Sequence, residues 1–220
     1  MCCPPVGRSG YSTAQLPATL IACHRPIVSA EVFALPPSTC SIDVPITIEF
    51  SEDDSGPTAN DAVELAADAR WQQSIRDAVH VAAQAQGYCR GQIGVLVTDD
   101  NTIQEINRRH LQHDYPTDVI SFPYGCSADE VEGELVVSLC TARRWAAEVG
   151  WAWQTELLLY VVHGTLHICG LEDSTAEQRQ QMRAAEQAAL TELGIRDASG
   201  LSRGFDSQLR DAAEADGEPR

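Results

Sequence analysis

The chain contains no lysine, and its fifteen arginines face 32 acidic residues, so the formal net charge is −17. Proteins that hold nucleic acid on a broad basic surface need clustered positive charge, and this composition excludes such a surface. It does not exclude a few well-placed arginines, because each can hold a phosphate through two N–H groups. Arginine pairs occur at Arg108-Arg109 and Arg143-Arg144, although their pattern alone favours a solvated helix face.

Long apolar runs are also absent. The longest spans residues 157–162, whereas a membrane-spanning helix needs about 20 apolar residues. The first residues show no charged segment followed by an apolar one, so the sequence has no recognisable secretory signal. We therefore expect a cytoplasmic protein that makes no contact with a membrane.

The eight cysteines include no Cys-x-x-Cys pair and follow no regular framework. In a reducing cytoplasm we expect them to be thiols. Cys169 follows His167 by two residues, which on a helix points the two side chains apart. We interpret Cys169 as a packing residue.

The chain divides into three parts by composition. Residues 1–45 show no period of 2 or 3.6, and we expect either a disordered extension or, in part, an upstream start that is never translated. Residues 46–194 are long enough for one domain with its own core. Residues 195–220 lose all periodicity and are expected to form a polar, flexible tail.

Apolar periodicity within the domain predicts an α+β fold. Strands are expected over residues 46–50, 92–98, 119–122 and 133–139. Helices are expected over residues 61–86, 102–109 and 141–149, from residue 153 to a glycine at 170, and over 174–193 behind a capping box of Ser174 and Glu177. The prediction is a small mixed four-stranded sheet covered by about five helices.

One of these helices carries a candidate metal site. His163 and His167 are four residues apart, which on a helix places both imidazoles on one face, close enough to share a metal ion. Gly170 fits the turn that ends the helix and brings Asp173 back towards them. Three ligands would leave the fourth zinc position open, as in catalytic sites. Glu172 is the rival third ligand, and Asp173 is preferred because its spacing matches known zinc sites of this pattern.

The segments HGTLHICGLED, TDVISFP and GELVVS resemble the YbeY family of bacterial metal-dependent endoribonucleases, over about residues 46–193. The resemblance implies maturation of the 3′ end of 16S ribosomal RNA and a part in ribosome quality control. It implies one zinc ion per chain, bound by His163, His167 and Asp173. It also implies ribosomal RNA and the small ribosomal subunit as partners.

The chain departs from the family pattern at two positions. The family's usual third ligand is a histidine, where this chain has Asp173, and the added negative charge should make bound water less acidic. The family commonly has an arginine credited with a catalytic or phosphate-binding role where this chain has Leu111. Arg108 and Arg109 are candidate replacements in substrate binding.

The residues of TDVISFP supply the other candidates. Asp118, as a partner of a ligand histidine, and Ser121, facing a phosphate, are candidate catalytic residues, and His113 can protonate a leaving group. Thr117 and Phe122 are candidates for substrate binding through the resemblance. Each has a purely structural alternative: Asp118 as a turn cap, Ser121 at a strand edge, Phe122 in the core and His113 in solvent.

Three functions remain open at this point. The first is a zinc-dependent endoribonuclease acting on single-stranded RNA by metal-assisted hydrolysis. The second is a metalloprotease-like hydrolase, disfavoured because Gly164 stands where His-Glu-x-x-His proteases carry the glutamate base. The third is a noncatalytic ribosome-associated factor with a structural metal, which Leu111 favours.

Overall fold

The computed structural model describes residues 41–51 and 59–195. The predicted N-terminal extension, up to residue 40, and the tail beyond residue 195 lie outside the described residues. The α+β class is confirmed, but the described part has five strands and six helices where we expected four and about five. No described helix has both the length and the apolar character to span a bilayer.

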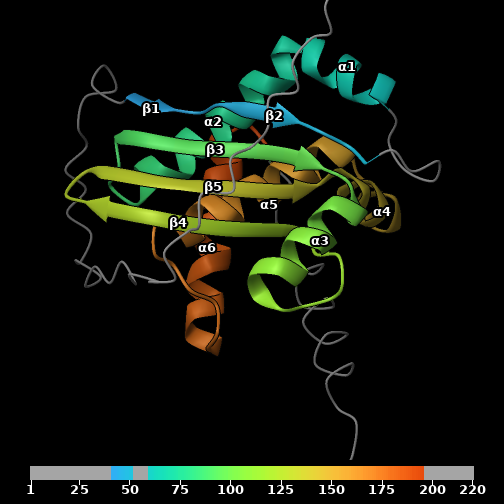
Figure 1. Cartoon of the computed structure of the whole chain (residues 1–220). Coiled ribbons are helices and arrows are strands. Elements are labelled where there is room, and N and C mark those ends of the chain that lie inside the picture. Colours follow the sequence, from blue (N-terminus) through green and yellow to red (C-terminus); the bar gives the residue numbers. More distant parts are fainter. Residues whose placement is uncertain (1–40, 52–58, 196–220) are drawn as a thin grey trace, which may run out of the picture.

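The sheet is mixed and has β3 (Arg90–Thr98) and β5 (Glu130–Ser138) at its centre, parallel to each other (Figure 1). β4 (Val119–Ser127) pairs antiparallel with β5 and forms one edge. β1 (Ser41–Asp43) and β2 (Ile46–Ile48) both run parallel to β3 on its other side. β1 is the additional strand, and it lies before the boundary expected at residue 46.

The two faces of the sheet are covered unequally. α2 (Ala69–Ala85), α5 (Trp153–Ile168) and α6 (Ala176–Glu192) pack together on one face, over the main apolar core (Figure 1). α3 (Asp100–Leu111) covers a smaller cluster on the other face, formed by Ile103, Ile120 and Val136. α4 (Leu139–Val149) contacts α5, and α1 (Ala59–Ala67) lies beside β2. α5 is therefore the central helix, which explains why it is apolar on nearly every side.

Several helix boundaries differ from the prediction because of local capping. The helix expected over residues 61–86 breaks at Asp68, whose carboxylate accepts hydrogen bonds from the backbone N–H of Arg70 and Trp71 and so starts α2. The capping box of α6 consists of Thr175 and Gln178, so the prediction of Ser174 and Glu177 is wrong by one residue.

The four cysteines within the described residues are in two states. Cys89 and Cys126 are disulfide-bonded, contrary to the expected thiols, whereas Cys140 and Cys169 are free. Burial raises the pKa of the Cys169 thiol to about 12, so this thiol stays protonated and unreactive. It packs in the main core, as the sequence predicted.

Candidate metal centre

The two histidines of α5 face each other. The Nε2 atoms of His163 and His167 are 2.9 Å apart, and their rings meet at 88°. His163 is buried and His167 is half-buried, so the pair is reached from the side of His167. The four-residue spacing thus places both imidazoles on one face of the helix, as predicted from the sequence.

The turn after α5 brings a carboxylate to this pair. Gly170 has φ +94°, a conformation that side-chain-bearing residues rarely adopt, and its N–H donates to the carbonyl of His167 at 2.9 Å. Asp173 Oδ2 then lies 3.8 Å from Nε2 of His167 and 4.0 Å from Nε2 of His163. The three side chains have ligand atoms within 4.8 Å of one another, a group that could hold a metal ion.

Glu172, the rival third ligand, is engaged elsewhere. Its Oε2 accepts a hydrogen bond from Nε2 of Gln178 at 3.2 Å. The carboxylate is exposed at the surface of the turn. The geometry therefore favours Asp173 over Glu172.

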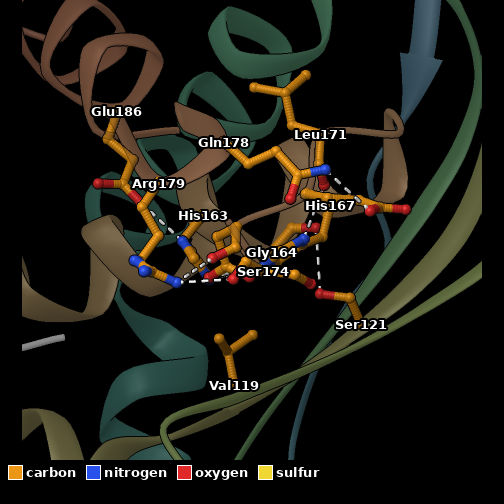
Figure 2. Close-up of polar contacts among 12 residues, drawn as sticks. Val119, Ser121, His163, Gly164, His167, Leu171, Ser174, Gln178, Arg179 and Glu186 are labelled. Carbon is orange, nitrogen blue, oxygen red and sulfur yellow. Dashed lines mark hydrogen bonds and ion pairs between the residues drawn. The ribbon is translucent and has the colours of Figure 1, made fainter. Parts of the chain in front are cut away.

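The hydrogen bonds of the two rings show why a cation fits here. His163 Nδ1–H donates to Glu186 Oε1 at 2.6 Å, and His167 Nδ1–H donates to the carbonyl of Leu171 at 2.8 Å, because both acceptors lack a hydrogen (Figure 2). In neutral rings both Nε2 atoms then carry bare lone pairs, and these face each other. A shared proton or a shared metal ion removes their repulsion, so the donor set suits a metal.

The pKa shifts of the two imidazoles follow from the same contacts. Burial acts to lower the pKa of His163, but the hydrogen bond and charge of Glu186 raise it above its ordinary value. Burial lowers the pKa of His167, and the neighbouring His163 lowers it further. His167 is thus neutral at pH 7, with its lone pair available to a cation.

The close approach of α5 to the sheet fixes the position of the histidine pair. Gly164 packs against β4 and β5 so tightly that a Cβ there would come within 2.6 Å of Leu135 Cδ2 and 2.9 Å of Val119 Cγ2. Ser121 Oγ on β4 donates to the carbonyl of Gly164 at 3.2 Å (Figure 2). Ser121 therefore joins β4 to the histidine helix beside the candidate ligands.

Asp118 is buried at the start of β4. Its Oδ1 accepts hydrogen bonds from Oγ1 of Thr117 and from the backbone N–H of Val119, both at 2.8 Å. Its charge is close enough to contribute to the raised pKa of His163. Asp118 thus combines a capping role with an electrostatic effect on the centre, and Thr117 is its neighbour.

The remaining predicted residues have partners on the α3 side of the sheet. Phe122 packs with the α3 cluster and meets His110 edge-on at 5.4 Å, and His113 stacks on Tyr115 at 5.4 Å. Arg108 and Arg109 are exposed, and both are ion-paired with Glu105 at 2.6 Å. Their proposed roles in substrate binding and proton transfer remain predictions.

Sequence reasoning missed Glu186, on α6, although its sequence context carried a signal. The buried stripe of α6 contains Met182, Ala189 and Leu190, and Glu186 lies within it at helical spacing. A charged residue in such a stripe needs a buried partner. Here the partner is His163.

Replacing Glu186 with alanine is expected to weaken metal binding about 10- to 100-fold, because His163 loses the acceptor that fixes its ring. Glu186→Gln should retain much of the affinity, since the amide oxygen still accepts from Nδ1–H. Competition with a chromophoric chelator measures the affinity. Glu192→Ala, at an exposed position of the same helix, is the matched control. Equal affinity in Glu186→Ala and the control would contradict this role.

The fold and these contacts define a mixed α/β protein with two histidines on a central helix and an aspartate on the turn that follows it, an arrangement typical of metal-dependent hydrolases. The family model described as Endoribonuclease YbeY matches residues 58–194. The chain therefore belongs to the YbeY endoribonuclease family.

Individual relatives agree with this membership. The Endoribonuclease YbeY of Rhodopirellula baltica is 53% identical over 123 residues, which is 55% of this chain and 63% of that protein. The protein of the same name from Bacteroides thetaiotaomicron is 42% identical over 49% of this chain and 78% of its own length. That of Desulforamulus reducens is 33% identical over 60% of this chain and 92% of its own length.

A solved structure also matches. The solution structure of TM1509 from Thermotoga maritima is 20% identical and covers 70% of this chain and 94% of its own, with a TM-score of 0.43. A similarity of that size says nothing about function.

Proposed function

We propose that this chain is a zinc-dependent endoribonuclease that cleaves single-stranded RNA in the 3′-end maturation of 16S ribosomal RNA and in ribosome quality control, acting on the small ribosomal subunit in the cytoplasm. The observation that carries the proposal is the pair of facing Nε2 atoms with Asp173 beside them, in a chain of the YbeY family. The names of the relatives support the reaction class.

The proposal gives each residue a task. His163, His167 and Asp173 would hold one zinc ion, which supplies Lewis-acid polarisation and an activated water when bound. Glu186 and the carbonyl of Leu171 hold the two rings in the tautomer that exposes Nε2. These contacts prepare the nitrogen donors before any substrate arrives.

Residues of β4 and the preceding loop complete the proposed site. Asp118 orients the start of β4 and adds negative charge near His163, and Ser121 keeps β4 against α5. His113, exposed in the loop, is the proposed proton donor to the leaving group, with Thr117, Phe122, Arg108 and Arg109 proposed for RNA contact. The three carboxylates near the histidine pair, those of Asp118, Asp173 and Glu186, suit the handling of protons in phosphodiester hydrolysis.

Peptide hydrolysis fits this site poorly. A glutamate base would have to replace Gly164, and the Cβ of any such residue would collide with Leu135 and Val119. The close contact between α5 and the sheet therefore leaves no place for the base of a His-Glu-x-x-His protease.

The proposal predicts that the zinc-loaded chain cleaves single-stranded RNA, that a chelator stops cleavage and added zinc restores it, and that His163→Ala is inactive. Labelled RNA resolved on a denaturing gel provides the measurement, with casein incubated in parallel. Casein digestion without RNA cleavage would establish the protease alternative. If the zinc-loaded wild-type chain binds small ribosomal subunits but cuts no RNA, that result would establish the noncatalytic factor.

A further inference from the structure

Arg179, in the first turn of α6, is held against the turn that carries Asp173. Its Nη1 donates to the backbone carbonyl of Asp173 at 3.1 Å and to that of Ser174 at 2.9 Å (Figure 2). The side chain is half-buried. These bonds use one of the three guanidinium nitrogens, and within the described part of the chain the Arg179 side chain has no other hydrogen bond or ion pair. The N–H groups on Nε and Nη2 are therefore available to a ligand.

This guanidinium differs from those that the sequence offered for RNA. Arg108 and Arg109 share Glu105 as a partner, and Arg144 is paired with Asp100 at 3.0 Å. In such a pair the carboxylate already offsets the positive charge that would attract a phosphate. Arg179 is anchored by neutral carbonyls, so its positive charge is not neutralised by its anchor.

The charge around the histidines makes a cation at this position useful. Asp173 and Glu186 contact the histidine pair, and Asp118 acts on it through its charge. Three carboxylates carry more negative charge than one divalent ion neutralises, so a phosphodiester would approach a site that repels it. Arg179 places a positive charge beside the backbone of Asp173, the residue whose carboxylate lies within 4.0 Å of both histidine Nε2 atoms.

We infer that Arg179 is a phosphate-binding residue of this centre, whose Nε–H and Nη2–H groups hold two oxygens of an RNA phosphate next to the His–His–Asp group. The inference rests on the proposed function and identifies the part of the substrate that this site holds. The planar guanidinium fork matches phosphate geometry, and its two carbonyl anchors fix the direction of the fork in advance.

Fluorescence anisotropy tests this inference. It measures the binding of a labelled single-stranded 2′-O-methyl RNA to the zinc-loaded full chain at several salt concentrations. The length of the RNA is checked afterwards, to confirm that it was not cut. Arg179→Gln keeps an N–H donor for the carbonyls but removes the charge, and it is expected to raise Kd about tenfold or more. The slope of log affinity against log salt should fall by about 0.7, the value for one phosphate contact on a single strand. Arg179→Lys should recover part of the loss.

Arg70→Gln, at an exposed position of α2, makes the same change in net charge and should alter neither Kd nor slope. Equal effects of the Arg179 and Arg70 variants would overturn the inference. Loss of zinc from Arg179→Gln would also overturn it, because Arg179 would then support only the Asp173 turn. If the wild-type chain cuts no RNA but Arg179→Gln still weakens RNA binding, the nuclease proposal fails and the phosphate site stands. If the wild-type chain and Arg179→Gln both cut RNA and bind it with equal affinity, the nuclease proposal stands and the phosphate site fails.

Discussion

Asp173→Ala is expected to lose most of its bound metal and to cleave RNA at least a hundredfold more slowly than the wild-type chain, while keeping its fold. Asp173 supplies the only carboxylate of the candidate ligand group, with its Oδ2 within 4.0 Å of both histidine Nε2 atoms. Two imidazoles alone bind zinc weakly compared with a three-ligand set. The fold should survive because Arg179 is anchored to the backbone carbonyl of residue 173, which alanine retains.

Elemental analysis of protein purified without added metal provides the measurement, with circular dichroism to confirm folding. Glu172→Ala is the matched control, since Glu172 is exposed and bonded to Gln178, and it should keep its metal. The opposite pattern, with metal lost from Glu172→Ala and kept in Asp173→Ala, would show that the ligand assignment is wrong.

Asp173→His extends the same experiment. It replaces the carboxylate by a third neutral imidazole, which removes one negative charge from the centre. We expect the variant to hold zinc and the pH–rate profile to move towards acid, because an ion with three neutral ligands makes its water more acidic. An unchanged profile with full zinc content would mean that the charge of Asp173 does not set the pH dependence.

The parts of the centre that the sequence predicted are those determined locally. His163 and His167 need only one helical turn to face the same way, and Gly170 with Asp173 needs only one reversal of the chain. Each of these steps spans a few residues, so composition and spacing suffice. The preference for Asp173 over Glu172 was predicted in the same way; the structure places the Asp173 carboxylate in the group that could hold a metal ion, and its role as a ligand remains a prediction.

The parts that were missed depend on tertiary contacts. Glu186 and Arg179 reach the site from α6, which lies beside α5 only because both helices cover the same core. The extent of the sheet was also underestimated: β1 is short, and its pairing with β3 is not encoded by its own three residues. By contrast, the neutralisation of Arg108 and Arg109 could have been predicted, since Glu105 lies at the helical spacing that favours such pairs.

Gly164→Ala is expected to lower the free energy of unfolding by about 1 to 3 kcal/mol, although alanine is the better helix former by about 1 kcal/mol. The added Cβ would lie 2.6 Å from Leu135 Cδ2, 2.9 Å from Val119 Cγ2 and 3.0 Å from Ser121 Oγ. Leu135 is fully buried and Val119 is β-branched, so neither side chain can move aside cheaply. Thermal unfolding should show a fall in Tm of roughly 3 to 10 °C.

Gly125→Ala is the matched control, because a Cβ at that glycine meets nothing within 4 Å, and its Tm should stay close to that of the wild type. The Gly164 variant should also lose metal affinity, since relief of the collision moves α5 away from β4 and carries both histidines with it. Wild-type Tm and metal affinity in Gly164→Ala would mean that the helix can move without disturbing the site. The expected result would instead show that the glycine is required for the contact with β4 that positions the histidine pair.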